Sequence, residues 1–226
     1  MEHIRRVYDA FSAFYNAGCS IIDIDPRIIE IAIILHDTGK GLESSPDHIE
    51  CGKNHALISE KLFWTFFIPW IDENEKRIVA QAIKWHNKGL RNRGIDTAKT
   101  IEDKVAQFLV LFDCMDGLNI PRVRSWAEET GTPEWDDYLS SEEIDAYLAS
   151  GQKLPEEIKN RSLLNNLLFN LNLLSEDGEV IRPIRHLIGN YEAFREWLEK
   201  SKTPAREEIR RILLRKSNEE KYHKLA

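Results

Sequence analysis

Histidine and aspartate residues lie along the first half of the sequence in positions that suit metal chemistry. The stretch AIILHDTGKG, residues 32–41, leads an apolar run directly into a His-Asp doublet. Other histidines fall at the ends of expected helices, and an aspartate lies inside an apolar helix, where a charge is costly unless it is paired or metal-bound. The candidate ligands are His3, His36, Asp37, His55, His86 and Asp113. Imidazoles with carboxylates suit Mn, Fe, Co, Ni or Zn, whereas an all-oxygen set suits Mg or Ca.

Each candidate ligand also has an ordinary explanation when it is taken alone. His3 can be an exposed residue near a frayed terminus, and His86 can be a cation that interacts with the dipole at a helix C-terminus. The doublet can simply close a helix, since Gly39 follows it. The metal hypothesis requires that these helix ends converge at one end of a bundle. Asp37, next to a ligand histidine, is then the natural bridge between two ions.

The elements that must position these residues are expected to be helices, which makes the fold class all-α. Apolar residues recur at spacings of three and four almost throughout, and strand-like alternation is scarce. In the first half we expect helices over residues 3–14, from Pro26 to the doublet, from His55, after a capping box at Asp72–Glu75 and after a cap at Thr100–Asp103. The aromatic residues Trp64, Phe66, Phe67 and Trp70 are expected in the core.

The character of the sequence changes after Pro121. Residues 122–160 are acidic and polar, which favours loop and short helix, and three helical stretches follow at 155–174, 183–200 and 203–216. We therefore predict a catalytic helical core over residues 1–121 and a mostly helical C-terminal extension over 122–226 that packs on it.

Composition excludes several classes of protein. The net charge of -7 argues against a surface devoted to nucleic acid, which needs clustered Lys and Arg. Three cysteines without a C-x-x-C spacing indicate reduced thiols rather than a disulfide framework or a zinc ribbon. The sequence shows neither a signal-peptide core nor a run of 18 apolar residues, so we expect a cytoplasmic protein that does not contact membranes.

The order of these motifs resembles the His-Asp (HD) superfamily of metal-dependent phosphohydrolases. The matching segments are HIRRV at His3, LHDTGKG at the doublet, NHALISEKL at His55, AIKWHNKG at His86 and LVLFDCMD at Asp113. The resemblance covers residues 1 to about 120 and implies an HD-type helical bundle. It also implies that the six candidate residues hold one or two divalent ions, whether Mn, Fe, Co, Ni, Zn or Mg.

The resemblance further implies hydrolysis of a phosphoester by metal-activated water, with Asp37 and Lys40 in catalytic roles. Lys40 is placed to reach a phosphate oxygen or the leaving group. The expected substrate is a nucleotide or a related small phosphorylated metabolite. Markers of three better defined subfamilies, such as a Gly-Tyr-Pro tripeptide or a Glu-Asp pair after the doublet, are missing from the sequence. A single-strand nuclease and a non-catalytic signalling or scaffold domain stay open as alternatives.

The sequence leaves several residue assignments open. His48 competes with His55 as the fourth ligand; we favour His55 and place His48 in a loop near the site, as a candidate substrate contact. Asp116 is expected to support the site or cap a helix rather than bind metal. Basic residues beyond the last ligands are candidate substrate contacts, with an ordinary solvated surface as the alternative: Lys88, Arg91, Arg93, Arg122 and Arg124.

Overall fold

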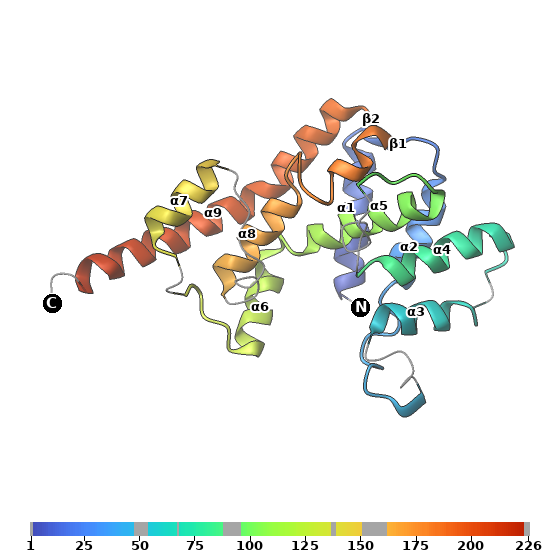
Figure 1. Cartoon of the computed structure of the whole chain (residues 1–226), viewed down its shortest axis with the longest axis horizontal. Coiled ribbons are helices and arrows are strands. Elements are labelled where there is room, and N and C mark those ends of the chain that lie inside the picture. Colours follow the sequence, from blue (N-terminus) through green and yellow to red (C-terminus); the bar gives the residue numbers. More distant parts are fainter. Residues whose placement is uncertain are drawn as a thin grey trace. The chain divides into compact units, whose positions relative to one another are not determined.

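The fold is all-α, as the sequence predicts, and is known from a computed structural model of the chain (Figure 1). The structure describes residues 2–47, 54–66, 68–87, 96–136, 139–150 and 162–223. The first helices are α1 (Glu2–Asn16), α2 (Pro26–Leu35), α3 (His55–Phe63), α4 (Glu73–Trp85) and α5 (Ile101–Asp116). After them come α6 (Ile120–Thr130), α7 (Ser141–Ser150), α8 (Leu163–Leu173) and α9 (Tyr191–His223).

Capping residues start the helices where the sequence predicts. The Asp25 side chain accepts a hydrogen bond from Arg27 N ahead of α2, and proline occupies the first turn of that helix. The capping box of α4 is complete, because Asp72 accepts from Glu75 N and Glu75 accepts from Asp72 N. Such caps satisfy amide groups that have no partner within the helix, so the starting points of helices are set by local sequence.

The chain forms two compact units, of which the first comprises Met1–Asp113 and Glu176–Trp197. In this unit α4 packs against both α2 and α3, and α2 packs against α1 (Figure 1). Phe14 is fully buried and meets the ring of Phe112 at 5.6 Å and that of Trp197 at 5.5 Å, both edge to face. The Gln107 amide donates to the Val180 carbonyl oxygen at 3.0 Å, which ties the returning segment to α5. The metal-ligand candidates all belong to this unit.

The second unit comprises Cys114–Ser175 and Leu198–Ala226. Within it α6 packs against α8, and the Asn170 amide donates to the Gly117 carbonyl oxygen at 3.3 Å. Glu134 pairs with Arg211 and Arg215 of α9 at 2.7 and 2.8 Å. The two compact units divide next to Asp113, and the first also includes residues 176–197 from late in the chain. The division into two domains at residue 121 stays a prediction.

Three local expectations differ from the structure. Residues 183–200 do not form one helix, because a 3₁₀ turn (η4, Arg182–Leu187) and strand β2 (Ile188–Gly189) precede α9. β2 pairs antiparallel with β1 (Ser20–Ile21), and two-residue strands leave no alternation pattern to detect. The stretches expected at 183–200 and 203–216 are joined in one helix, α9, that continues through Pro204, since burial of residues such as Ala205 and Ile209 offsets the hydrogen bond that a proline removes.

Two further differences concern polar and aromatic segments. Residues 120–130 form a regular helix with an Asn119 cap and a left-handed Gly131 at its end, in a region where loop and short helix were expected. Trp64, Phe66 and Trp70 are exposed at 41%, 37% and 65%, so their assignment to the core was wrong; Phe67 lies outside the described residues. Among the described residues, no helix combines the length and apolar character needed to cross a membrane.

Candidate metal centre

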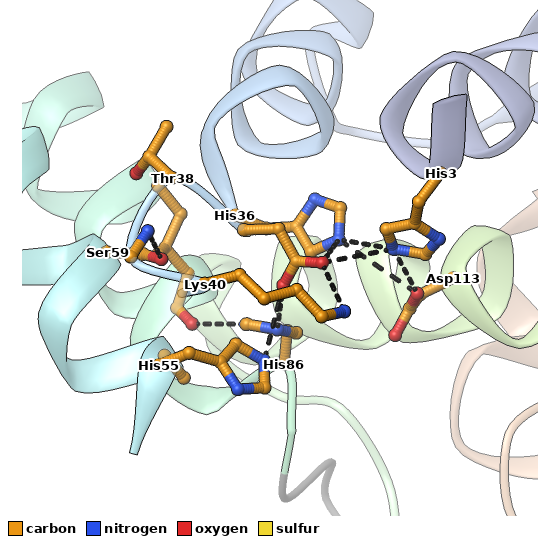
Figure 2. A network of polar contacts seen from close by, with 12 residues as sticks. His3, His36, Thr38, Lys40, His55, Ser59, His86 and Asp113 are labelled. Atoms are coloured by element: carbon orange, nitrogen blue, oxygen red, sulfur yellow. Dashed lines mark hydrogen bonds and ion pairs between the residues drawn. The ribbon is translucent and has the colours of Figure 1, made fainter. Parts of the chain in front are cut away.

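Five segments of the first unit deliver the candidate ligands to one place. His36 follows the last turn of α2 and Asp37 comes next to it, while His86 occupies the equivalent position at the end of α4. His3 lies in the first turn of α1, His55 opens α3, and Asp113 lies in α5. Figure 2 shows the side chains of the four histidines and Asp113 turned toward one another. The structure thus brings together all six residues that the sequence singles out.

The two carboxylate oxygens of Asp37 face different pairs of histidines. Oδ2 lies 3.3 Å from His3 Nε2 and 3.7 Å from His36 Nε2. Oδ1 lies 3.2 Å from His55 Nε2 and 3.7 Å from His86 Nε2. Two groups of potential ligands result, His3 with His36 and Asp37, and Asp37 with His55 and His86, and in each the ligand atoms lie within 4.8 Å of one another. Asp37 is the member that both groups share.

Asp113 closes the first group on the side of α5. Its Oδ1 lies 3.2 Å from His3 Nε2 and 3.9 Å from His36 Nε2 (Figure 2). The His3 and His36 Nε2 atoms are themselves 3.2 Å apart. A second carboxylate therefore faces the same two imidazole nitrogens as Asp37 Oδ2.

The tautomers of His36 and His86 are set by the helices that carry them. At the end of a helix the last carbonyl groups have no partner within the helix. His36 Nδ1 lies 2.7 Å from the Ile33 carbonyl oxygen, and His86 Nδ1 lies 2.6 Å from the Ile83 carbonyl oxygen. Each Nδ1–H donates to that carbonyl, so the neutral ring turns the lone pair of Nε2 toward the cluster.

This arrangement fits a divalent cation. Nitrogen lone pairs and carboxylate oxygens converge, and such groups repel one another unless a cation lies among them. Burial lowers the pKa of His36 even though the neighbouring carboxylates act in the opposite direction, which favours the neutral ring that a metal requires. Burial alone would raise the pKa of Asp37, but the neighbouring His55, His86, His36 and Lys40 side chains together hold the pKa of that carboxyl well below its usual range.

A tight turn fixes the doublet against α3. Gly39 N donates to the buried Ser59 hydroxyl at 2.8 Å (Figure 2). A Cβ atom at residue 39 would lie 2.7 Å from Ile58 Cβ and 2.8 Å from the His55 carbonyl oxygen, so only glycine fits this approach. The turn therefore sets the distance between Asp37 and the helix that begins with His55.

Lys40 meets the cluster from this same turn. Its ammonium group donates to Asp37 Oδ2 at 2.9 Å, while the side chain is 51% exposed. Lys40 thus reaches both the shared carboxylate and solvent.

The remaining predicted substrate contacts are not brought to the cluster by any described contact. Arg122 pairs with the buried Asp116 at 2.7 Å, and Arg124 pairs with Glu208, all within the second unit. Asp116 thus anchors the start of α6, and its expected role in support of the metal site stays a prediction. His48, Lys88, Arg91 and Arg93 lie outside the described residues, so their roles stay predictions.

Sequence reasoning missed two residues beside the cluster. Ser59 lies four residues after His55, on the same side of α3, and its only sequence signal is that spacing. Glu43 Oε1 lies 3.7 Å from His55 Nδ1, and it comes from a loop whose path the sequence does not define.

Comparison with protein families supports the same interpretation. The family model described as HD domain matches residues 1–118, and the chain therefore belongs to the HD domain family. Comparison with curated proteins and with solved structures gave no match. The family indicates a metal-dependent hydrolase superfamily, and the His and Asp groups described above are able to hold a divalent metal ion.

Proposed function

We propose that this protein is a metal-dependent phosphohydrolase that cleaves a phosphoester in a small molecule such as a nucleotide. The observation that carries the proposal is the position of the Asp37 carboxylate: its two oxygens face two separate pairs of histidines. A carboxylate so placed is the ligand expected to bridge two ions, and paired ions are a recurring solution for phosphoryl transfer.

The residues that would hold the metal are the six of the cluster. His3, His36, Asp37 and Asp113 would serve one ion, and Asp37, His55 and His86 would serve a second. A bound divalent ion supplies a Lewis acid that polarises the phosphoryl group and acidifies water at neutral pH. The set mixes imidazole with carboxylate, which favours Mn, Fe, Co, Ni or Zn over Mg.

The chain itself supplies positioning and charge. The carbonyl oxygens of Ile33 and Ile83 keep two imidazoles in the tautomer that leaves Nε2 unprotonated. Lys40 holds a positive charge at the solvent side of Asp37, where it can donate to an oxygen of an anionic phosphoester. Since phosphoryl transfer depends mainly on positioning and electrostatic stabilisation, these groups together with a bound ion would meet the needs of a hydrolytic site.

The substrate class rests on charge. The net charge of -7 disfavours a long polyanion, so a small phosphoester is the better candidate than a nucleic acid. The cytoplasmic location stays a prediction from the sequence.

Hydrolysis assays test this function. Metal-free protein is loaded in turn with Mn²⁺, Co²⁺, Zn²⁺ or Mg²⁺ and assayed against nucleotides, simple phosphomonoesters, phosphodiesters and single-stranded DNA. We expect hydrolysis of a small phosphoester, and Lys40→Ala should lower kcat by about 100-fold without loss of metal. Lys76→Ala is the control, because that lysine lies over the ring of Trp64 and not at the cluster.

Three results would contradict the proposal. Cleavage of single-stranded DNA alone, with affinity that falls steeply with salt, would indicate a nuclease instead. A metal-loaded protein that is inactive on the whole panel would indicate a scaffold. Equal activity of Lys40→Ala and Lys76→Ala would remove Lys40 from the mechanism.

A further inference from the structure

The histidines of the cluster differ in what their outer nitrogen contacts. His36 and His86 each donate Nδ1–H to the carbonyl oxygen three residues earlier, at 2.7 and 2.6 Å. His55 has no such bond among the described residues, and the group that faces its Nδ1 is the Glu43 carboxylate, 3.7 Å away. His55 therefore relies on a side chain for an interaction that His36 and His86 obtain from the backbone.

The position of His55 in its helix explains the difference. His36 and His86 follow the last turns of α2 and α4, where carbonyl groups lack helical partners. His55 is the first residue of α3, after the Asn54 cap. A helix N-terminus presents amide groups rather than free carbonyls, so it offers no acceptor to the imidazole of its first residue. An acceptor for Nδ1–H must come from elsewhere in the chain.

Glu43 is held in place to supply that acceptor. Its Oε2 accepts a hydrogen bond from Gly41 N at 2.6 Å, and Gly41 has a φ of +90°, which favours glycine. This bond leaves Oε1 directed at His55, with the Glu43 side chain only 27% exposed. The separation of 3.7 Å is longer than a hydrogen bond, but contacts of this kind often shorten when a site is filled.

We propose that Glu43 is the positioning residue of His55, and that it accepts the Nδ1–H of His55 and so directs Nε2 at the metal. Such a carboxylate fixes the ring orientation and makes the ligand nitrogen more basic. The inference rests on the proposed metal centre, and it extends the site to a residue of the loop after the His-Asp doublet. Glu43 does not contact the substrate in this account, because it acts through His55.

Nuclear magnetic resonance of the zinc-loaded full chain tests the contact directly. The Nδ1–H proton of His55 is assigned as the resonance that His55→Ala removes. In the wild type it should lie far downfield and exchange slowly with water, because it is bonded to a carboxylate. Glu43→Ala should shift it upfield and speed its exchange. Zinc affinity should fall by about 10- to 100-fold, as is usual when a partner of a ligand histidine is lost.

The matched control is Ser45→Ala. Ser45 lies in the same loop and accepts a hydrogen bond from Asp47 N, so its loss disturbs the loop without removing a group that faces a histidine. The His55 resonance and zinc affinity should stay as in the wild type. Thermal unfolding of both variants verifies that they are folded.

The outcomes separate this inference from the proposed function. If Glu43→Ala leaves the His55 resonance and the zinc affinity unchanged, Glu43 is not a positioning residue. The inference is equally wrong if Ser45→Ala has the same effect as Glu43→Ala, since the loop alone would then be responsible. If the protein binds zinc but hydrolyses nothing, the proposed phosphohydrolase function is wrong. The Nδ1–H resonance of His55 would still decide the role of Glu43. Failure of the wild type to bind zinc would overturn both.

Discussion

Substitution of Gly39 by alanine tests how the turn after the doublet positions α3. An added Cβ would lie 2.7 Å from Ile58 Cβ, 2.7 Å from Ser59 N and 2.8 Å from the His55 carbonyl oxygen. Carbon atoms in contact normally lie about 3.5 to 4.0 Å apart, so the first turns of α3 must move by about 1 Å. The atoms that Cβ would meet are mostly backbone, and no rotation of a flexible side chain relieves the collision.

The expected cost follows from these distances. Forcing a methyl group into a packed contact costs about 1 to 3 kcal/mol, and loss of the hydrogen bond from Gly39 N to Ser59 costs about 1 kcal/mol more. Gly39→Ala should therefore lower the free energy of unfolding by about 2 to 4 kcal/mol. It should also lower kcat/KM by about 100-fold, because His55 moves with α3 relative to Asp37.

Urea unfolding and steady-state kinetics measure both effects, and Gly131→Ala in the second unit is the matched control. A Cβ at Gly131 meets nothing within 4 Å, although its φ of +68° makes any side chain unfavourable there. The control should cost about 1 to 2 kcal/mol through backbone strain and leave α3 in place. Equal losses of kcat/KM in the two variants would refute the idea that contact between Gly39 and α3 sets the geometry.

Two further predictions concern the scaffold. Burial raises the pKa of Tyr15 to about 12 from its ordinary value of 10.0, and the charge of Asp25 acts in the same direction. Because the folded value is the higher one, the neutral phenol contributes stability that is complete below pH 10 and is lost as the pH rises toward 12. Tyr15→Phe should therefore show a smaller fall of the urea midpoint over this range, and an equal fall in both proteins would contradict the prediction. Asp72→Ala removes the capping box of α4 and should lower the free energy of unfolding by about 1 kcal/mol. Urea titration should show a smaller loss for the control Glu73→Ala, which lies in the same turn.

Local signals explain why the sequence predicts so much of the site. His36 and Asp37 end a helix with a clear cap at Asp25, and His55 begins one, so their places in the elements follow from short segments. Asp113 is conspicuous because it is a charge in an apolar helix. That these residues converge could be predicted only from the order of motifs that the sequence shares with the family, because no single segment shows it.

Long-range contacts account for what the sequence does not predict. The β1–β2 pairing and the bonds from Gln107 to residues near 180 join distant parts of the chain, and neither leaves a periodic pattern. Glu43 is one acidic residue in a polar loop, so its relation to His55 becomes visible only when the loop and α3 are placed together. The continuity of α9 through Pro204 likewise depends on burial of its neighbours, which propensity alone does not reveal.

Metal titration of Asp37→Asn tests the central claim most directly. Asparagine keeps the shape of Asp37 but removes the charge that both histidine pairs share, and Asp47→Asn is the control because Asp47 is an exposed aspartate of the nearby loop. Calorimetric titration of metal-free protein with Mn²⁺ should give tight binding for the wild type and for Asp47→Asn. Asp37→Asn should bind more than about 100-fold more weakly, since loss of the residue that both ligand groups share exceeds the effect of losing a supporting residue. Equal Mn²⁺ affinity in all three proteins would contradict the metal centre described here.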